Sequence, residues 1–246
     1  DYTTFLDPNG LRGARIGVAR NFFGFSQQVD RLMDQSLEAM KRLGAVLIDP
    51  ASIPTAGKFD DSELEVLLYE FKADLNSYLA RLGPRAPVRS LKEVIDFNER
   101  HREQEMPYFG QELMLTAQAK GPLTSTDYRT ALAKNHRLSR TEGIDAVIRK
   151  HRLDAIVAPT GGPPWVTDLI NGDHFSGGSS TPAAVAGYPA ITVPAGFVYG
   201  LPVGISFFGP AWSEPTLIKL AYAFEQATTF RRPPKFLASI DLRQDT

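Results

Sequence analysis

The chain has 246 residues, of which 43% are apolar, and a formal net charge of −1. This length and apolar content are sufficient for a sizeable hydrophobic core in one large domain or two small ones. The 27 basic residues are dispersed and balanced by 28 acidic ones, so no charged patch predicts binding to nucleic acid or to an anionic membrane. The sequence contains no cysteine, which excludes disulfides, thiolate metal sites and a cysteine nucleophile.

Glycine and proline interrupt the longest apolar runs well short of a membrane span, and no signal peptide is visible. We therefore expect a soluble protein, with a cytoplasmic location slightly favoured and the compartment left open. The sequence begins with Asp1 and Tyr2 and has no initiator methionine. We expect either that a leader was removed or that this is a piece of a longer protein.

The first third predicts a parallel strand–helix–strand unit. Residues 14–20 form a short apolar run typical of a buried strand. Residues 28–43 place apolar side chains at helical spacing, and Gly44 is a plausible C-cap. A second apolar run follows at 45–48, and a strand, a helix and a strand in this order favour parallel pairing.

Residues 62–119 read as helical, interrupted by Pro84, Pro87 and Pro107. The first helix carries one apolar stripe at helical spacing, made of Leu64, Leu67, Leu68, Phe71, Leu75 and Leu79. Residues 127–150 predict the longest helix of the chain. Such helical segments usually pack over a sheet or line its mouth.

The last third returns to apolar strands at 155–158, 190–193 and 203–208, followed by an amphipathic helix over 216–228. The fold class is therefore α/β, with a mixed, largely parallel central sheet flanked by helices. We expect segments 155–157 and 191–193 to be adjacent central strands. Strands from both ends of the chain must share the sheet, so we expect a single α/β unit over 1–246.

Several strings resemble the C-terminal part of amidase signature enzymes. The most specific runs from Thr181 to Gly209, TPAAVAGYPAITVPAGFVYGLPVGISFFG, and a second is LDAIVAPT at 153–160. Further similarities begin at Thr4 and end at Arg232. These similarities follow one another in the same order as in the family. They cover nearly the whole chain but only about half of the family's catalytic domain, so the 1–246 unit is expected to be incomplete.

The resemblance implies a serine hydrolase that converts carboxamides to a carboxylate plus ammonia or an amine. The family uses a nucleophilic serine, a bridging serine with a cis peptide and a lysine, all in a cassette that precedes the region matched here. We therefore expect no catalytic residue in this chain, no activity of the chain alone, and no cofactor or metal. Independently of the resemblance, no lysine lies in a small-residue loop and no Gly-x-Ser-x-Gly elbow is present.

The sequence GGSS at 177–180 looks like the family's nucleophile loop, but Thr181 and Pro182 follow it where that loop has glycine and small residues. Its position matches a downstream helix N-terminus. Ser180 or Thr181 then serves as an N-cap, with Pro182 at the first helical position. In relatives the loop before this helix faces the active site, so Ser179 is a candidate pocket residue.

The Gly- and Pro-rich loop 161–178 contains a second group of candidates. Functional side chains often lie on such loops, and in relatives this loop lies near the acyl pocket. We therefore predict that Trp165, Asp173, His174 and Phe175 contact substrate. The alternative is that the Asp and Asn side chains only make local turn hydrogen bonds.

Two other functions stay open. The chain could be the amidase-like subunit of a tRNA-dependent amidotransferase, but those subunits carry an acidic residue for glutamine where this sequence has Gly177. It could instead be a non-catalytic binding or scaffold homologue, although 183–196 keeps an interior character. The expected partners are a small-molecule amide and either the missing N-terminal half or a self-associated copy, which requires an exposed apolar surface.

Overall fold

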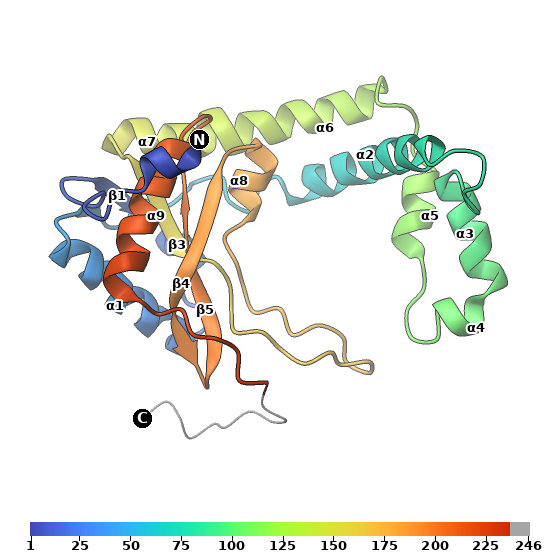
Figure 1. Cartoon of the computed structure of the whole chain (residues 1–246). Coiled ribbons are helices and arrows are strands. Elements are labelled where there is room, and N and C mark those ends of the chain that lie inside the picture. The colour runs from blue at the N-terminus through green and yellow to red at the C-terminus, as the bar shows by residue number, and fades with distance from the viewer. Residues whose placement is uncertain (237–246) are drawn as a thin grey trace. The chain divides into compact units, whose positions relative to one another are not determined.

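The computed structural model describes residues 1–236 (Figure 1). This part of the chain forms two compact units. The sheet unit comprises Asp1–Ala56 and the chain from Arg137 onward, and the helical unit comprises Gly57–His136. Strands from both ends of the chain share one sheet, whereas the expectation of one α/β unit over 1–246 stays a prediction.

The sheet has five strands in the order β2-β1-β3-β5-β4. Their bounds are Arg15–Val18 (β1), Val46–Ile48 (β2), Ala155–Pro159 (β3), Ala190–Val198 (β4) and Leu201–Phe208 (β5). β1 pairs in parallel with β2 and β3, whereas β5 pairs antiparallel with β3 and β4. The expected mixed α/β sheet is therefore confirmed.

The expected adjacency of segments 155–157 and 191–193 is wrong, because β5 lies between β3 and β4. The cause is the two-residue turn at Tyr199 and Gly200, both of which have positive φ (51° and 76°). Such tight turns match the twist of a hairpin, so β4 folds back directly onto β5. β4 thereby becomes an edge strand, and its register shifts at a bulge between Pro194 and Gly196.

Helices cover both faces of this sheet. The sheet unit contains η1 (Tyr2–Phe5), η2 (Arg20–Phe22), α1 (Gln27–Arg42), the π-helical η3 (Arg137–Ile144), α7 (Asp145–His151), α8 (Thr181–Ala186) and α9 (Glu214–Thr228). Ser26 caps α1 by accepting a hydrogen bond from the Val29 amide. The single helix expected over 127–150 is wrong, because a non-helical Gly143 (φ −103°, ψ −109°) interrupts the segment.

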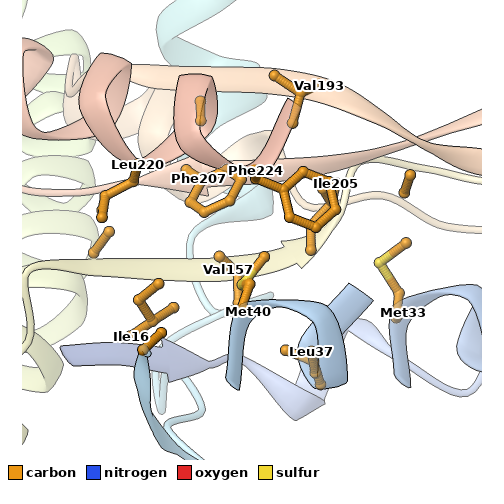
Figure 2. Packing of buried hydrophobic residues seen from close by; sticks show 14 of the residues in the cluster. Ile16, Met33, Leu37, Met40, Val157, Val193, Ile205, Phe207, Leu220 and Phe224 are labelled. Carbon is orange, nitrogen blue, oxygen red and sulfur yellow. The ribbon is translucent and has the colours of Figure 1, made fainter. Parts of the chain in front are cut away.

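The main core lies between the sheet and helices α1 and α9 (Figure 2). Met33, Leu37 and Met40 of α1 and Leu220 and Phe224 of α9 point toward the strands. On the strands they meet Ile16, Val157, Val193, Ile205 and Phe207. A second core on the opposite face joins Ile156, Ala158 and Phe208 to α7 and α8. Alternate residues of β3 and β5 therefore serve two different cores, as the period-2 geometry of strands requires.

The helical unit contains α2 (Asp60–Arg81), α3 (Leu91–Arg100), α4 (Arg102–Glu105), α5 (Glu112–Gln118) and α6 (Thr126–His136). Val66 and Tyr69 of α2 pack against α6, and Leu68 packs against α3 and α5. No helix within residues 1–236 has both the length and the hydropathy required to cross a bilayer.

The apolar stripe expected on α2 does not act as one buried face. Leu68 and Leu79 are buried, whereas Leu64, Leu67 and Phe71 are exposed. The exposed residues lie on the same side of the helix as Tyr78, because their spacings are three, four and seven residues. We call Leu64, Leu67, Phe71 and Tyr78 the α2 stripe; their exposed fractions range from 41% to 55%.

The packing of α9 on the sheet predicts a large cost for truncating Phe224, which is fully buried and lies 6.1 Å from the ring of Phe207. Phe224→Ala should lower the free energy of unfolding by about 3–5 kcal/mol, measured by urea denaturation with circular dichroism. Trp212→Ala is the control, because the indole is exposed and its loss should change stability by about 0.5 kcal/mol or less. Equal effects of the two changes would contradict this core assignment.

Candidate functional site

The candidate site lies at the carboxyl end of β3. All five residues of β3 are buried, and Thr160 follows directly after them. The chain then leaves the sheet as the loop 161–178, whose two ends are joined by an antiparallel bridge between Gly161 and Gly178. In α/β sheets, ligands commonly bind outside the carboxyl ends of strands. The sheet thus presents this loop where a ligand site is expected.

Ser179 holds the base of the loop against β3. Its side chain is 2% exposed, and its Oγ donates a hydrogen bond to the Pro159 carbonyl (2.7 Å). Its amide also donates to the Thr160 carbonyl (3.4 Å). Since the hydroxyl hydrogen is committed to a backbone carbonyl, it is not placed for removal by a general base. The predicted role of Ser179 as a pocket residue stays a prediction.

Ser180 occupies the N-cap of α8, as expected, but the helix begins at Thr181, so Pro182 is its second residue and not its first. The Ser180 side chain makes no capping hydrogen bond, however, and its backbone is already in the right-handed helical region. Gly187 ends the helix in the left-handed conformation. The GGSS sequence is therefore a loop-to-helix junction.

The structure brings the aromatic candidates of the loop together. The rings of Trp165 and Phe175 meet edge to face with centroids 6.2 Å apart, and the Trp165 indole N–H donates to Asp173 Oδ1 (3.4 Å). Phe175 is 69% exposed, and the side chain of Trp165 is also accessible. Two predicted aromatic residues thus form one exposed surface, and the predicted Asp173 is hydrogen-bonded to it.

Asp168 organises the opposite part of the loop. Its carboxylate accepts hydrogen bonds from the amides of Ile170 and Asn171 and from the Asn171 side chain, each at 2.9 Å. His174 Nε2 lies 3.3 Å from Asp168 Oδ2. The bonds from Asn171, followed by those from Ile170 and His174, lower the pKa of Asp168 well below its ordinary value. The local turn expected as the alternative is therefore present, and it also positions His174.

Sequence reasoning missed three hydroxyls beside this loop. Thr160 Oγ1 lies 2.6 Å from Thr192 Oγ1 and 2.8 Å from Ser206 Oγ. These residues, which we call the hydroxyl cluster, come from the end of β3, from β4 and from β5. Thr192 and Ser206 are direct partners in the β4–β5 register. Only the strand order brings the three residues together, although a polar residue within each apolar run was a visible signal.

No group of three His, Asp or Glu side chains within residues 1–236 converges on a point that could hold a metal ion. Besides the carboxylates of Asp168 and Asp173 and the ring of His174, the arrangement at the end of β3 offers uncharged hydroxyl groups and aromatic surface. Such groups suit the binding and orientation of an uncharged organic ligand.

The Asp168 turn makes a pH prediction. Since folding lowers the pKa of this carboxyl group, its contribution to loop order is complete above the ordinary aspartate pKa of about 3.9 and is lost as the pH falls through the lower folded value. The ¹³C shift of the Asp168 carboxyl should therefore titrate at a lower pH in the protein than in a linear 165–175 peptide. Asp168→Ala should shift the Ile170 and Asn171 amide signals. Equal midpoints in protein and peptide would rule out this turn.

The family model Amidase matches residues 2–218. A probable amidase of Arabidopsis thaliana is 41% identical over 243 residues, which are 96% of this chain and 42% of the relative. A glutamyl-tRNA(Gln) amidotransferase subunit from Moorella thermoacetica is 30% identical, over 94% of this chain and 48% of its own length.

Solved structures give the same result. A peptide amidase, PAM, in complex with the competitive inhibitor chymostatin has a TM-score of 0.91 and 47% identity, over 96% of this chain and 48% of that one. The native peptide amidase from Stenotrophomonas maltophilia has a TM-score of 0.87 and 46% identity over 96% and 47%. The chain spans about half the length of the relatives it matches. With a family match over residues 2–218, the chain belongs to the amidase signature family.

Proposed function

We propose that this chain is the C-terminal portion of an amidase that hydrolyses linear carboxamides to a carboxylate plus ammonia or an amine. The observation that carries the proposal is the high similarity to peptide amidases across 96% of this chain and 48% of theirs. By resemblance to the family, the serine nucleophile, the bridging serine and the lysine belong to the other half. This chain contributes half of the sheet architecture and one wall of the substrate pocket.

The loop 161–178 supplies that wall. The exposed Trp165 and Phe175 rings offer apolar contact to the acyl or side-chain part of an amide, since apolar and aromatic side chains dominate small-molecule sites. Asp173 and His174 fix the loop through Trp165 and Asp168 and offer polar contacts at its edge. Ser179 anchors the loop to β3 from below.

The second candidate is the amidase-like component of a tRNA-dependent amidotransferase, which the match to the Moorella thermoacetica protein favours. The structure argues against glutamine binding by the route those proteins use. By the family resemblance, Gly177 corresponds to the position of their acidic residue, and a Cβ built there would lie 2.6 Å from Cδ1 of Phe25. An aspartate or glutamate would therefore displace the Phe25 ring. The scaffold alternative lacks a comparable observation in its favour.

The α2 stripe is the surface of the helical unit that we assign to contact with the rest of the protein. Four large apolar side chains remain exposed along one side of a 22-residue helix, although the adjacent sides of α2 are packed. Contiguous exposed apolar surface usually marks an interaction site. The relatives are about twice as long as this chain, so the additional half is the occupant that the proposal requires, in preference to a second copy.

A chimera tests the proposed activity. The N-terminal half of the Stenotrophomonas maltophilia peptide amidase, up to the point where the match begins, would be joined to this chain. We expect the chimera to release ammonia from a peptide C-terminal amide and the isolated 246-residue chain to release none, because the reacting groups lie in the added half. A folded chimera without amidase activity would contradict the proposed function.

Leu67→Lys tests the α2 stripe in a mixture of two separate chains, the N-terminal half of the peptide amidase and this chain. Burying a leucine side chain contributes about 1.5–3 kcal/mol, so placing a charge there should weaken association of the halves at least tenfold, as measured by calorimetry. Ser77→Lys is the matched control, because Ser77 is exposed on the same helix outside the stripe. Equal association of both variants would show that the stripe is not the contact surface.

A further inference from the structure

The hydroxyl cluster has hydrogen-bonding capacity that the described chain does not use. Thr160, Thr192 and Ser206 supply three O–H donors, and two hydrogen bonds connect them. Each bond consumes one hydrogen, so one O–H of the cluster remains available, whichever direction the shared hydrogens take. Several oxygen lone pairs also remain available. The cluster is therefore both a donor and an acceptor.

The free O–H and lone pairs of the hydroxyl cluster lie at an accessible surface. Thr192 is exposed, and Thr160 and Ser206 are half-buried. They lie on the face of the sheet that carries Ala158 and Phe208, since these residues share their strand parity. Thr160 also connects the cluster to the base of the loop, because its carbonyl accepts from the Ser179 amide. The hydroxyl cluster and the loop that carries the aromatic surface therefore both start at the carboxyl end of β3.

Gly204 keeps the cluster compact. A Cβ at this position would lie 2.6 Å from Thr192 Oγ1 and 2.8 Å from Thr160 Oγ1, closer than real Cβ contacts. The glycine in β5 therefore allows a hydroxyl from β4 and one from the end of β3 to meet across it. Any side chain here would push the hydroxyls apart or cover them.

The chemistry of the cluster selects its ligand. The hydrogen-bond partners of the three hydroxyls within residues 1–236 are other hydroxyls of the cluster and include no charged group. A carboxylate would meet no compensating charge and would offer no N–H to the spare lone pairs. A neutral carboxamide offers a carbonyl oxygen that can accept from the free O–H of the cluster. It also offers an N–H that can donate to the free oxygen lone pairs.

We infer that the Thr160–Thr192–Ser206 hydroxyl cluster is a binding site for a neutral carboxamide group of the substrate. This inference rests on the proposed function and deepens it, because it assigns a polar anchor beside the aromatic wall. The three residues are binding residues and take no part in bond making or breaking. The same chemistry favours the amide over the carboxylate product, which helps the product to leave.

The test measures binding and requires no hydrolysis. The 246-residue chain would carry ¹³C-methyl threonine and be titrated with 3-phenylpropanamide and, separately, with 3-phenylpropanoate, which contains no amide group. We expect the methyl signals of Thr160 and Thr192 to shift with the amide, while those of Thr4 and Thr216 stay unchanged. The acid should bind at least about threefold more weakly, since it lacks one hydrogen bond.

Substitutions then test which hydroxyl groups of the cluster bind the amide. Thr192→Val and Ser206→Ala should each raise the Kd of the amide about fivefold, the effect of losing one net hydrogen bond. Thr192→Ser retains the hydroxyl and should stay within about twofold of the unmodified chain. Ser213→Ala is the matched control, because it removes one hydroxyl outside the cluster that donates to the Pro210 carbonyl. Gly204→Ala should weaken binding while keeping all three hydroxyls.

Absent shifts at Thr160 and Thr192 up to the solubility limit would overturn the inference, as would unchanged Kd values for Thr192→Val and Ser206→Ala. Failure of the proposed function has a different signature. In that case the chain binds the amide as described, but the folded chimera with the peptide amidase half releases no ammonia. Hydrolysis by the chimera without any effect of the cluster substitutions on binding would leave the proposed function intact and refute this inference.

Discussion

The antiparallel pairing of β5 with β3 is the constraint on which the rest of the sheet unit depends. It attaches the C-terminal hairpin to the parallel β1–β2–β3 core and fixes which residues of β5 face each side. A shift of one residue would exchange Phe207 for Phe208 and Ile205 for Ser206 between the two faces. Each core would still receive one phenylalanine, but the main core would receive the polar Ser206 in place of the buried Ile205. The register is consequently specified by burial on both faces.

Local patterns were sufficient to predict much of this fold. The β1–α1–β2 unit follows from two short apolar runs around a helix with clear periodicity, and Gly44 marks the end of that helix. The hairpin order was not predictable in the same way, because β3, β4 and β5 are all short apolar runs and any two could have been neighbours. The turn at Tyr199 and Gly200 contained the missing information in its length.

The helical unit shows a second limit of periodicity. On α2, the arc containing Leu68 and Leu79 and the arc containing Leu64 and Leu67 lie next to each other, so they merge into one wide stripe in the sequence. The two arcs differ only in whether another helix of the unit packs on them. Periodicity predicts that a face is apolar, but the identity of its partner is a tertiary property.

The candidate site also has one part that the sequence could propose and another part that only the tertiary structure reveals. Its loop residues could be proposed from the sequence because they are close together in the chain and because the family resemblance points to the loop. The hydroxyl cluster joins Thr160 to residues 32 and 46 positions away, so only the strand register reveals it. A single threonine or serine in a strand carries little information, since such residues are common on half-exposed sheet surfaces.

The bulge in β4 has a consequence for how this chain behaves in solution. An exposed edge strand of nine residues is a template on which another polypeptide can add by main-chain pairing. Pro194 lacks an N–H donor, and the register shift beside it bends the strand, so the edge is divided into two shorter lengths. This interruption disfavours open-ended, fibre-like growth along the edge.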